Sequence, residues 1–339
     1  MINRIYRLKD VGYIEADFAS VSLSDDRVIV RPTYLSICAA DQRYYSGERS
    51  PEVMKKKLPM ALIHEGIGTV LWDGTGSFEP GASVVMLPNE AAAGETYIKE
   101  NYRPDSRFMS SGYDGFMQDY VALPPAQLLR LPEKAGIHYV FTELLSVACN
   151  AITTWQALGR DQGLRFGVWG SGSMGYVTAL ALRVQYPNAH ITVIGRSREK
   201  LQYFSFADRL LQISQEIPQN DFDCCFECVG GSSSQLAVDK MIAAVRPQGA
   251  MVLLGVSEEP IPIRTRMILE KGIALLGASR SSREDFEMAV GMIGRKKRME
   301  NYLKVIISQV VTARTLRDIN EAFNIDNYAP FKTVIEWKM

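Results

Sequence analysis

Short apolar runs separated by glycine and proline turns dominate the first 130 residues of the chain. Such runs occur at residues 28–32, 66–72 and 115–121, and residues 78–86 are a turn followed by a run of the same kind. Each run predicts a short strand, and Pro32 is expected to end the first one, because proline has no N–H to donate to a sheet. Residues 88–113 are polar and rich in turn-forming residues, which predicts a long loop. Short strands with turns between them favour a partly open β-barrel.

A second pattern begins near residue 140, where helical and strand-like stretches alternate. Apolar stretches that are typical of buried strands occur at residues 164–170, 191–195, 222–228 and 250–255. An apolar stretch at 176–184 predicts a helix between the first two strands. This alternation predicts an α/β fold with a doubly wound parallel sheet. Near the C-terminus, residues 303–307 and 332–337 are strand-like and are expected to return to the barrel.

Composition and charge limit the possible functions. The chain has 339 residues, of which 47% are hydrophobic, so it is long enough for two domains and is not a disordered protein. Its formal net charge of +0 gives no reason to expect nucleic acid or a membrane surface as a partner. Neither a signal peptide nor a run of roughly 18 apolar residues for membrane insertion is expected. Three of the 5 cysteines crowd into residues 224–228, which suits a buried strand in a reduced, cytoplasmic protein.

A glycine-rich fingerprint predicts a dinucleotide site. The G-x-G-x-x-G sequence consists of Gly170, Ser171, Gly172, Ser173, Met174 and Gly175. It follows an apolar strand and opens an apolar helix, which is the context that this motif requires. The glycines allow a tight turn, a close approach of the backbone to a pyrophosphate, and packing of the helix on the strand.

The residues after the next predicted strand indicate which nicotinamide cofactor is used. NAD-binding domains place an acidic residue there, whereas this chain has Gly195 and then Arg196. Arg196 can pair with a 2′-phosphate through two hydrogen bonds, Ser197 can donate a third, and Lys200 adds positive charge. The sequence therefore predicts NADP(H). The alternative is that these basic residues are an ordinary helix start without a role in cofactor binding.

Four side chains upstream of this fingerprint have the donor atoms that zinc accepts. They are Cys38, the adjacent pair His64 and Glu65, and Glu143. Three protein ligands and one open position are typical of a catalytic zinc site. Zinc that polarises a carbonyl group beside a nicotinamide would promote hydride transfer.

The order and spacing of these motifs resemble the zinc-dependent medium-chain dehydrogenase/reductase family over nearly the whole chain. The motifs that carry the resemblance are Cys-x-x-Asp at 38–41, His-Glu-Gly-x-Gly at 64–68, and the stretches 114–121 and 170–175. The resemblance implies a GroES-like, partly open barrel as the catalytic domain, formed by residues 1–147 and 281–339. It implies a Rossmann domain that binds NADP at 148–280.

The chain departs from the family pattern at two places. Ile63 replaces the glycine that usually precedes the His-Glu pair. Residues 88–113 contain none of the four cysteines of the family's structural zinc lobe. We therefore expect one catalytic zinc per chain and no structural zinc, with the 88–113 loop held by packing or by a partner subunit.

The resemblance also assigns roles within the site. Cys38 and His64 would be fixed ligands of zinc, while Glu65 and Glu143 compete for the third position. The remaining glutamate would exchange with water or orient it, and the sequence does not decide between the two. Asp41 would hydrogen-bond a ligand, relay a proton, or simply stabilise a turn.

A finer resemblance is to the ribulose-5-phosphate reductases that supply ribitol 5-phosphate for teichoic acids or capsules. It is carried by residues 34–45, 58–66, 226–231 and 254–258. It implies that NADPH reduces the ketone of D-ribulose 5-phosphate and that a cytidylyltransferase acts on the product. Arg280 and then Arg43 are expected to contact the phosphosugar, and Gly255 to contact the cofactor. Family members dimerise through a sheet edge, here expected at 250–255 and 273–276.

Three other functions remain open at this point. The first is a dehydrogenase of the same fold that acts on a neutral polyol. The second is a zinc-free relative that shares only the fold. The third is an NADP-binding sensor without catalytic activity, which the intact set of zinc-binding residues disfavours.

Overall fold

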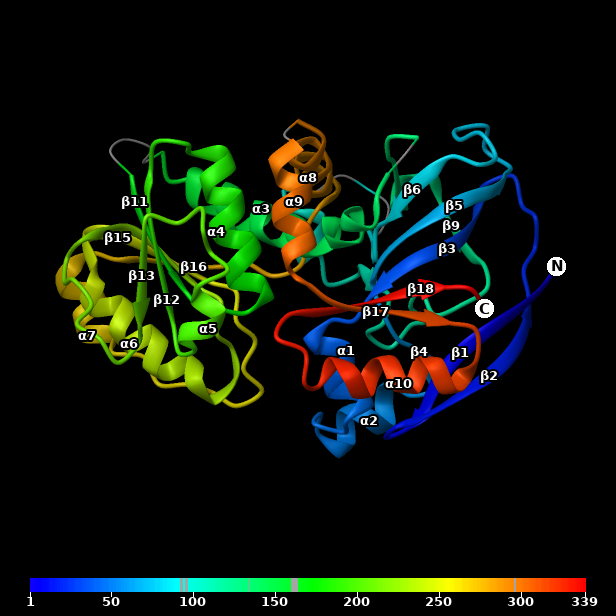
Figure 1. Cartoon of the computed structure of the whole chain (residues 1–339), viewed down its shortest axis with the longest axis horizontal. Helices are drawn as coiled ribbons and strands as arrows, with labels where there is room; N and C mark the ends of the chain where they lie inside the picture. Colours follow the sequence, from blue (N-terminus) through cyan, green and yellow to red (C-terminus); the bar gives the residue numbers. More distant parts are fainter. Residues whose placement is uncertain (92–93, 95–96, 134, 160–163, 296) are drawn as a thin grey trace. The chain divides into compact units, whose positions relative to one another are not determined.

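The protein is described by a computed structural model that covers residues 1–339 except 92, 93, 95, 96, 134, 160–163 and 296 (Figure 1). Contacts between Cα atoms divide the chain into two compact units. The barrel unit consists of Met1–Glu143 and Ser281–Met339, and the nucleotide unit consists of Leu144–Arg280.

The barrel unit is built from largely antiparallel strands. Its main sheet has the order β10-β6-β5-β3-β18-β17, with β9 also pairing with β3, and a second sheet has the order β2-β1-β4. These strands are β1 (Ile2–Asp10), β2 (Tyr13–Ser20), β3 (Val28–Ser36), β4 (Met60–Ala61), β5 (Glu65–Asp73), β6 (Ser83–Met86), β9 (Val121–Leu123), β10 (Leu128–Arg130), β17 (Ile307–Ala313) and β18 (Lys332–Trp337). Buried aliphatic and aromatic side chains of both sheets form one core.

Helices cover parts of this unit and connect its strands. They are α1 (Ala39–Tyr45), α2 (Pro51–Lys57), α8 (Arg283–Arg295), α9 (Lys297–Val305) and α10 (Leu316–Asp326). In Figure 1, α10 lies alongside β17 and β18, and α10 contacts both strands. Thr315 caps the start of α10 by accepting a hydrogen bond from the Asp318 N–H, so a polar residue sets the beginning of the helix. The C-terminal strand β18 pairs with β3, so the end of the chain joins the sheet formed by its beginning.

The structure corrects the prediction that Pro32 ends a strand. Strand β3 continues to Ser36, and its register with β5 shifts between Pro32 and Tyr34. A bulge accommodates a residue that cannot donate a hydrogen bond. The longer strand carries the chain to within two residues of Cys38.

Two other strand predictions were displaced. Within 115–121 only Val121 belongs to a strand, and the N–H groups of Gly115 and Phe116 form isolated hydrogen bonds with the carbonyls of Ala61 and Ile63. Within 303–307, α9 continues to Val305 and β17 begins at Ile307. The predicted loop 88–113 contains the short strands β7 (Asn89–Glu90) and β8 (Arg107–Phe108), which pair with each other.

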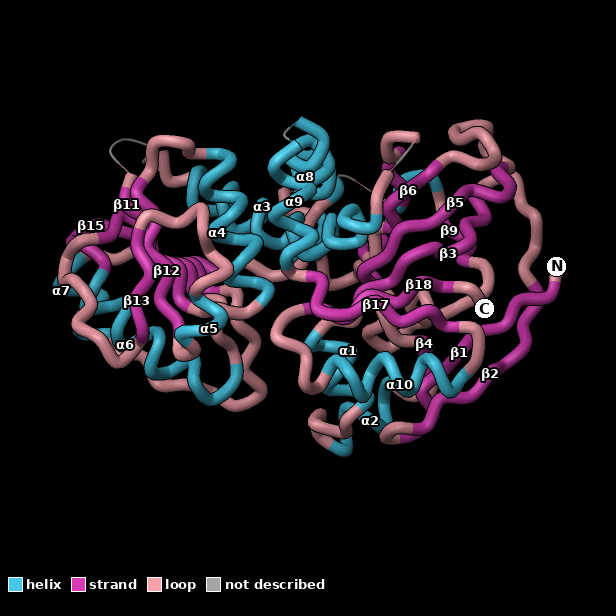
Figure 2. Tube along the Cα trace, viewed as in Figure 1, coloured by secondary structure: helices cyan, strands magenta, loops and turns pink. Residues whose placement is uncertain are grey.

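The nucleotide unit contains the predicted doubly wound parallel sheet, with helices on both of its sides (Figure 2). The strand order is β13-β12-β11-β14-β15-β16. The strands are β11 (Arg165–Trp169), β12 (His190–Gly195), β13 (Arg209–Gln212), β14 (Phe222–Glu227), β15 (Val245–Leu253) and β16 (Ala274–Gly277). The helices are α4 (Ser173–Gln185), α5 (Arg198–Leu201), α6 (Ser234–Ala244) and α7 (Thr265–Lys271), while α3 (Thr142–Gln156) begins in the barrel unit. None of the described helices has the length and apolar character needed to span a bilayer.

Two glycines of the fingerprint are required by their surroundings. A Cβ on Gly175 would lie 1.9 Å from the Gly170 carbonyl oxygen, so any side chain there would separate α4 from the turn. Gly170 itself has φ +122°, a conformation that L side chains rarely adopt. The close packing expected of the third glycine is therefore present in this fold.

Candidate functional site

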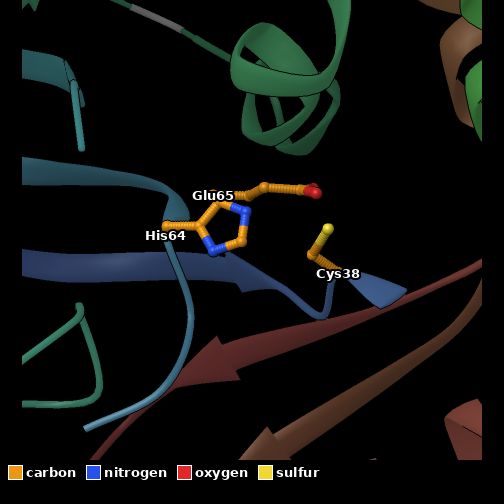
Figure 3. Close-up of side chains that lie close together, drawn as sticks. All are labelled: Cys38, His64 and Glu65. Carbon is orange, nitrogen blue, oxygen red and sulfur yellow. The ribbon is translucent and has the colours of Figure 1, made fainter. Parts of the chain in front are cut away.

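Three side chains with zinc-binding donor atoms converge in the barrel unit, and we call Cys38, His64 and Glu65 the trio. Cys38 lies between β3 and α1, while His64 and Glu65 lie at the start of β5. The two strands are paired, with Ser36 opposite Glu65, so the end of β3 meets the beginning of β5. One thiol sulfur, one imidazole nitrogen and one carboxylate oxygen lie within 4.8 Å of one another. Figure 3 shows the three side chains directed toward each other.

A buried lysine orients Glu65. Lys332 Nζ donates a hydrogen bond to Glu65 Oε1 at 2.7 Å, and the two side chains are 6% and 0% exposed. Burial lowers the pKa of Lys332, but the negative charges of Glu65 and Cys38 outweigh burial and raise the pKa. Glu65 Oε2 is buried without a hydrogen-bond partner among the described residues. Because lysine occupies Oε1, Oε2 is the oxygen left for a further ligand.

Asp41 connects the two chain segments that carry the trio. Its Oδ2 accepts a hydrogen bond from the Cys38 N–H at 3.1 Å, and its Oδ1 accepts one from the Ile63 N–H at 2.9 Å. Oδ1 also lies 3.5 Å from His64 Nδ1. Burial raises the pKa of Asp41, but the charge of His64 and the hydrogen bonds outweigh burial and keep the pKa below its usual value. The geometry is that of a residue that orients a ligand from behind.

The residue before His64 has a strained backbone. Ile63 has φ +69°, which lies in the left-handed region that β-branched residues avoid. Glycine, which the resembled family usually has at this position, would adopt this conformation freely. The isoleucine side chain is fully buried, and its N–H is bonded to Asp41. Packing and this hydrogen bond together hold a conformation that the side chain alone disfavours.

Glu143 lies beside the trio in the first turn of α3. Its side chain is buried, and burial raises its pKa to about 7. The charge of Glu65 raises this pKa as well, while the charge of His64 opposes both effects. Among the residues that the structure describes, the group of donor atoms that lie within 4.8 Å of one another consists of the trio and does not include Glu143. Of the two glutamates that the sequence left open, the geometry favours Glu65 as the third ligand.

The trio fits a zinc ion. A thiolate, an imidazole and a carboxylate are donors that zinc accepts, and Glu65 Oε2 is a buried oxygen that needs a partner. Burial lowers the pKa of His64, but the negative charges of Asp41 and Cys38 outweigh burial and raise it well above 6.5. The surroundings therefore stabilise positive charge at this place, which a divalent cation would supply.

A cavity of about 470 Å³ lies at the carboxyl ends of β11, β12 and β14 in the nucleotide unit. Ligands of doubly wound sheets bind at this edge. Among the predicted cofactor residues, those that line the cavity are Gly170, Ser171, Gly172, Arg196, Ser197 and Lys200. Ser173, Met174 and Gly175 instead form the first turn of α4.

The basic residues of this cavity are close together. Ser197 Oγ caps α5 by accepting a hydrogen bond from the Lys200 N–H at 3.2 Å. Burial lowers the pKa of Lys200, and the positive charge of Arg196 lowers it further. A like-charged pair of this kind is stabilised by an anion between its members.

A buried glutamate shapes the loops around the same cavity. Glu227 ends β14, and its carboxylate accepts hydrogen bonds from the N–H groups of Val229, Gly230 and Gly255 at 2.8–2.9 Å. A Cβ on Gly255 would lie 2.4 Å from Glu227 Oε2, so glycine is required at that position. Glu227 thus links the loop after β14 to the loop after β15.

The two arginines predicted to contact substrate lie in different units. Arg43 lies in α1 of the barrel unit, five residues after Cys38. Arg280 is the last residue of the nucleotide unit and has φ +57°. Its carbonyl accepts a hydrogen bond from Asn150 Nδ2 at 3.0 Å, and burial lowers the pKa of its guanidinium group.

Comparisons with known proteins agree with this geometry. Residues 24–133 match the alcohol dehydrogenase GroES-like domain, and residues 188–295 match the zinc-binding dehydrogenase domain. Ribulose-5-phosphate reductase from Bacillus spizizenii is 45% identical over 342 aligned positions, which cover 100% of both chains. The chain belongs to the zinc-binding medium-chain dehydrogenase/reductase family. It is therefore an oxidoreductase, as the sequence motifs predicted.

Other members of this dehydrogenase family extend the comparison. The ribulose-5-phosphate reductase of Streptococcus pneumoniae is 40% identical, covering 100% of this chain and 98% of that protein. The crystal structure of S. aureus TarJ in complex with NADPH has a TM-score of 0.90 and 39% identity, with full coverage of both chains. L-idonate 5-dehydrogenase from Escherichia coli shares the fold with a TM-score of 0.86 at 23% identity. The predicted combination of a GroES-like barrel and a Rossmann domain is confirmed.

Sequence reasoning did not identify Lys332 or Glu227 as contributors to these sites. Each is a charged residue at the end of a mostly buried strand, and that position is a usable signal for a buried polar contact. The partner of Lys332, and Gly255 among the partners of Glu227, lie far away in sequence. Lys332 and Glu65 are 267 positions apart, so no local pattern could pair them.

Proposed function

We propose that the protein reduces D-ribulose 5-phosphate to D-ribitol 5-phosphate with NADPH. The observation that carries this proposal is the convergent trio in a chain whose relatives along the full length are named ribulose-5-phosphate reductases at 40–45% identity. A ketone in the substrate requires an electrophile that holds its oxygen and a hydride donor on the carbon. The trio and the cofactor cavity provide residues for these two tasks.

Within this proposal Cys38, His64 and Glu65 hold one zinc ion. Zinc bound there would act as a Lewis acid that stabilises negative charge developing on the C2 oxygen. Lys332 keeps Glu65 directed inward, and Asp41 keeps Cys38 and His64 in place. Glu143, whose pKa burial raises to about 7, is suited to carry a proton at neutral pH.

The nicotinamide cofactor is assigned to the cavity of the nucleotide unit. The TarJ structure that contains NADPH supports NADP(H), and so does the absence of an acidic residue directly after β12. Gly170, Ser171 and Gly172 present backbone to the pyrophosphate. Arg196 and Lys200 contact the 2′-phosphate, with Ser197 as a further donor.

An assay of NADPH oxidation tests the reaction. We expect turnover with D-ribulose 5-phosphate and its loss after dialysis against a strong chelator, with recovery when zinc is restored. Unphosphorylated D-ribulose serves as the matched substrate, because a neutral-polyol dehydrogenase would use it at least as well. Activity that survives complete zinc removal would point instead to the zinc-free alternative.

Arg196→Ala is expected to change cofactor preference. Loss of a bidentate arginine–phosphate contact costs about 2 kcal/mol, which corresponds to a roughly 30-fold lower kcat/KM for NADPH. The value for NADH should change little, because NADH lacks the 2′-phosphate. The matched control is Arg198→Ala, since Arg198 is an arginine two positions later that begins α5. Equal efficiency of the unchanged protein with NADH and NADPH would remove the assignment.

The remaining assignments are proposals of the same kind. Arg280 and Arg43 are proposed to contact the phosphosugar, and Gly255 to approach the cofactor. A single catalytic zinc without a structural one, a homodimer through β16 at the sheet edge, and a cytoplasmic location complete the proposal. The product would pass to a cytidylyltransferase for CDP-ribitol, teichoic acid or capsule synthesis. An unchanged KM for ribulose 5-phosphate in Arg280→Ala would exclude that arginine.

A further inference from the structure

The two ends of the stretch 88–113 are joined to each other, and we call the described residues of this stretch, 88–91, 94 and 97–113, the lobe. Strands β7 and β8 pair, with Asn89 opposite Phe108. The Met109 N–H donates a hydrogen bond to the Pro88 carbonyl at 2.9 Å. The two ends of the lobe are therefore held side by side.

The C-terminal end of the lobe contacts the residues around the trio directly. The Phe108 ring packs edge-on against the His64 ring, with 5.3 Å between the centroids and 61° between the planes. Ser110 is buried, and its hydroxyl donates a hydrogen bond to Asp41 Oδ1. Ser110 also has φ +63°, so the backbone is strained at the residue that makes this contact.

The Ser110 hydrogen bond is made to the Asp41 carboxylate, which also bonds to the segment that contains Cys38 and to the residue before His64. Asp41 Oδ1 accepts from Ser110 and from the Ile63 N–H, while Oδ2 accepts from the Cys38 N–H. Each bond removes freedom of rotation from a side chain that lies 3.5 Å from His64 Nδ1. Without Ser110, Asp41 Oδ1 would lose one of the two donors that fix its orientation toward His64.

An ion pair anchors the other part of the lobe. Lys99 Nζ lies 2.8 Å from Asp285 Oδ2, and the Asp285 side chain is 2% exposed. Ser282 donates to the same carboxylate through its N–H and its hydroxyl, each at 2.8 Å. The Arg283 N–H donates to the Glu100 carboxylate. The start of α8 thus binds the lobe through two carboxylates, Asp285 in α8 and Glu100 in the lobe.

We propose that the lobe positions the metal-binding residues, with Ser110 as a positioning residue that acts through Asp41 on Cys38 and His64. The Lys99–Asp285 pair anchors the lobe, which has no cysteines to bind a structural metal. This proposal rests on the proposed function in one respect, because it takes the trio to be ligands of zinc.

Ser110→Ala tests the positioning role, and Ser111→Ala is the matched control. Ser111 lies in the same lobe, but its hydroxyl accepts from Lys57 Nζ at 2.8 Å and not from the site. Residues that orient a metal ligand typically contribute 10–100-fold to metal affinity. We therefore expect Ser110→Ala to weaken zinc binding by roughly 10-fold or more in competition with a chromophoric chelator. The visible absorption of the Co²⁺-substituted protein should shift in Ser110→Ala and stay unchanged in Ser111→Ala.

Thermal unfolding followed by circular dichroism shows whether each variant is folded, because NADPH binding would report on the nucleotide unit and the substituted residues lie in the barrel unit. Equal zinc affinity and equal Co²⁺ spectra in the two serine variants would overturn the role of Ser110. Lys99→Met should weaken zinc binding in the same direction, and unchanged zinc affinity in that variant would overturn the anchor. If the unchanged protein itself bound no zinc, the proposed function would fail, which is a different result from either of these.

Discussion

Glu65→Gln is expected to lose zinc, whereas Glu143→Gln is expected to keep it. The two substitutions are matched, because each replaces a buried carboxylate beside His64 by an amide of the same shape. Of the two glutamates, Glu65 belongs to the group of described donor atoms that lie within 4.8 Å of one another, together with Cys38 and His64. Loss of a Lewis acid worth several kcal/mol corresponds to a fall in kcat/KM on the order of 10³-fold for Glu65→Gln. Zinc per chain after dialysis, together with NADPH oxidation, measures both effects.

Thermal unfolding followed by circular dichroism provides the control for folding of the barrel unit, to which both glutamates belong. NADPH fluorescence would report on the nucleotide unit, whose residues line the cofactor cavity. A reduced rate with full zinc content in Glu143→Gln is the result expected of a proton carrier. If Glu143→Gln lost zinc and Glu65→Gln kept it, Glu143 and not Glu65 would be the third zinc ligand.

The sequence predicts those parts of the fold that depend on local patterns. The glycine fingerprint between β11 and α4 is one example, because strand, turn and helix follow one another within a few residues. The placement of Pro32 inside β3 could not be read in this way, since a bulge depends on how the partner strand pairs. The same holds for residues 115–117, whose N–H groups bond to the carbonyls of residues 61–63, more than 50 positions earlier.

The candidate site likewise has features that the sequence predicts and features that only the structure shows. Its donor atoms are visible in the sequence as residue types, and the resemblance places Cys38 and His64 among the ligands. The choice between Glu65 and Glu143 depends on a distance, and the sequence contains no distances. The contacts of Ser110 with Asp41 and of Lys332 with Glu65 join segments separated by 69 and 267 positions. Such contacts follow from tertiary packing and require a structure.

Lys332→Met is expected to destabilise the metal-free protein strongly. Removing one partner of a buried ion pair leaves the Glu65 charge uncompensated and typically costs about 3–5 kcal/mol. In a unit of this size, 3 kcal/mol corresponds to a fall in the thermal midpoint of roughly 6–12 °C. The measurement is made in the presence of a chelator, so that lost stability is separated from lost zinc. The matched control is Lys338→Met, because the Lys338 side chain is 53% exposed and its pair with Glu336 should contribute at most about 1 kcal/mol.

A double variant separates charge from packing at this pair. Glu65→Gln removes the charge that Lys332→Met leaves behind, so the combined variant should be more stable than Lys332→Met alone. Simple addition of the two losses would mean that Lys332 stabilises the protein through the packing of its hydrocarbon chain. A stability of Lys332→Met close to that of Lys338→Met would exclude an energetic role for the pair. If the double variant regains stability relative to Lys332→Met, the loss in the single variant comes from the uncompensated negative charge of Glu65. Lys332 then stabilises the protein by neutralising that buried charge.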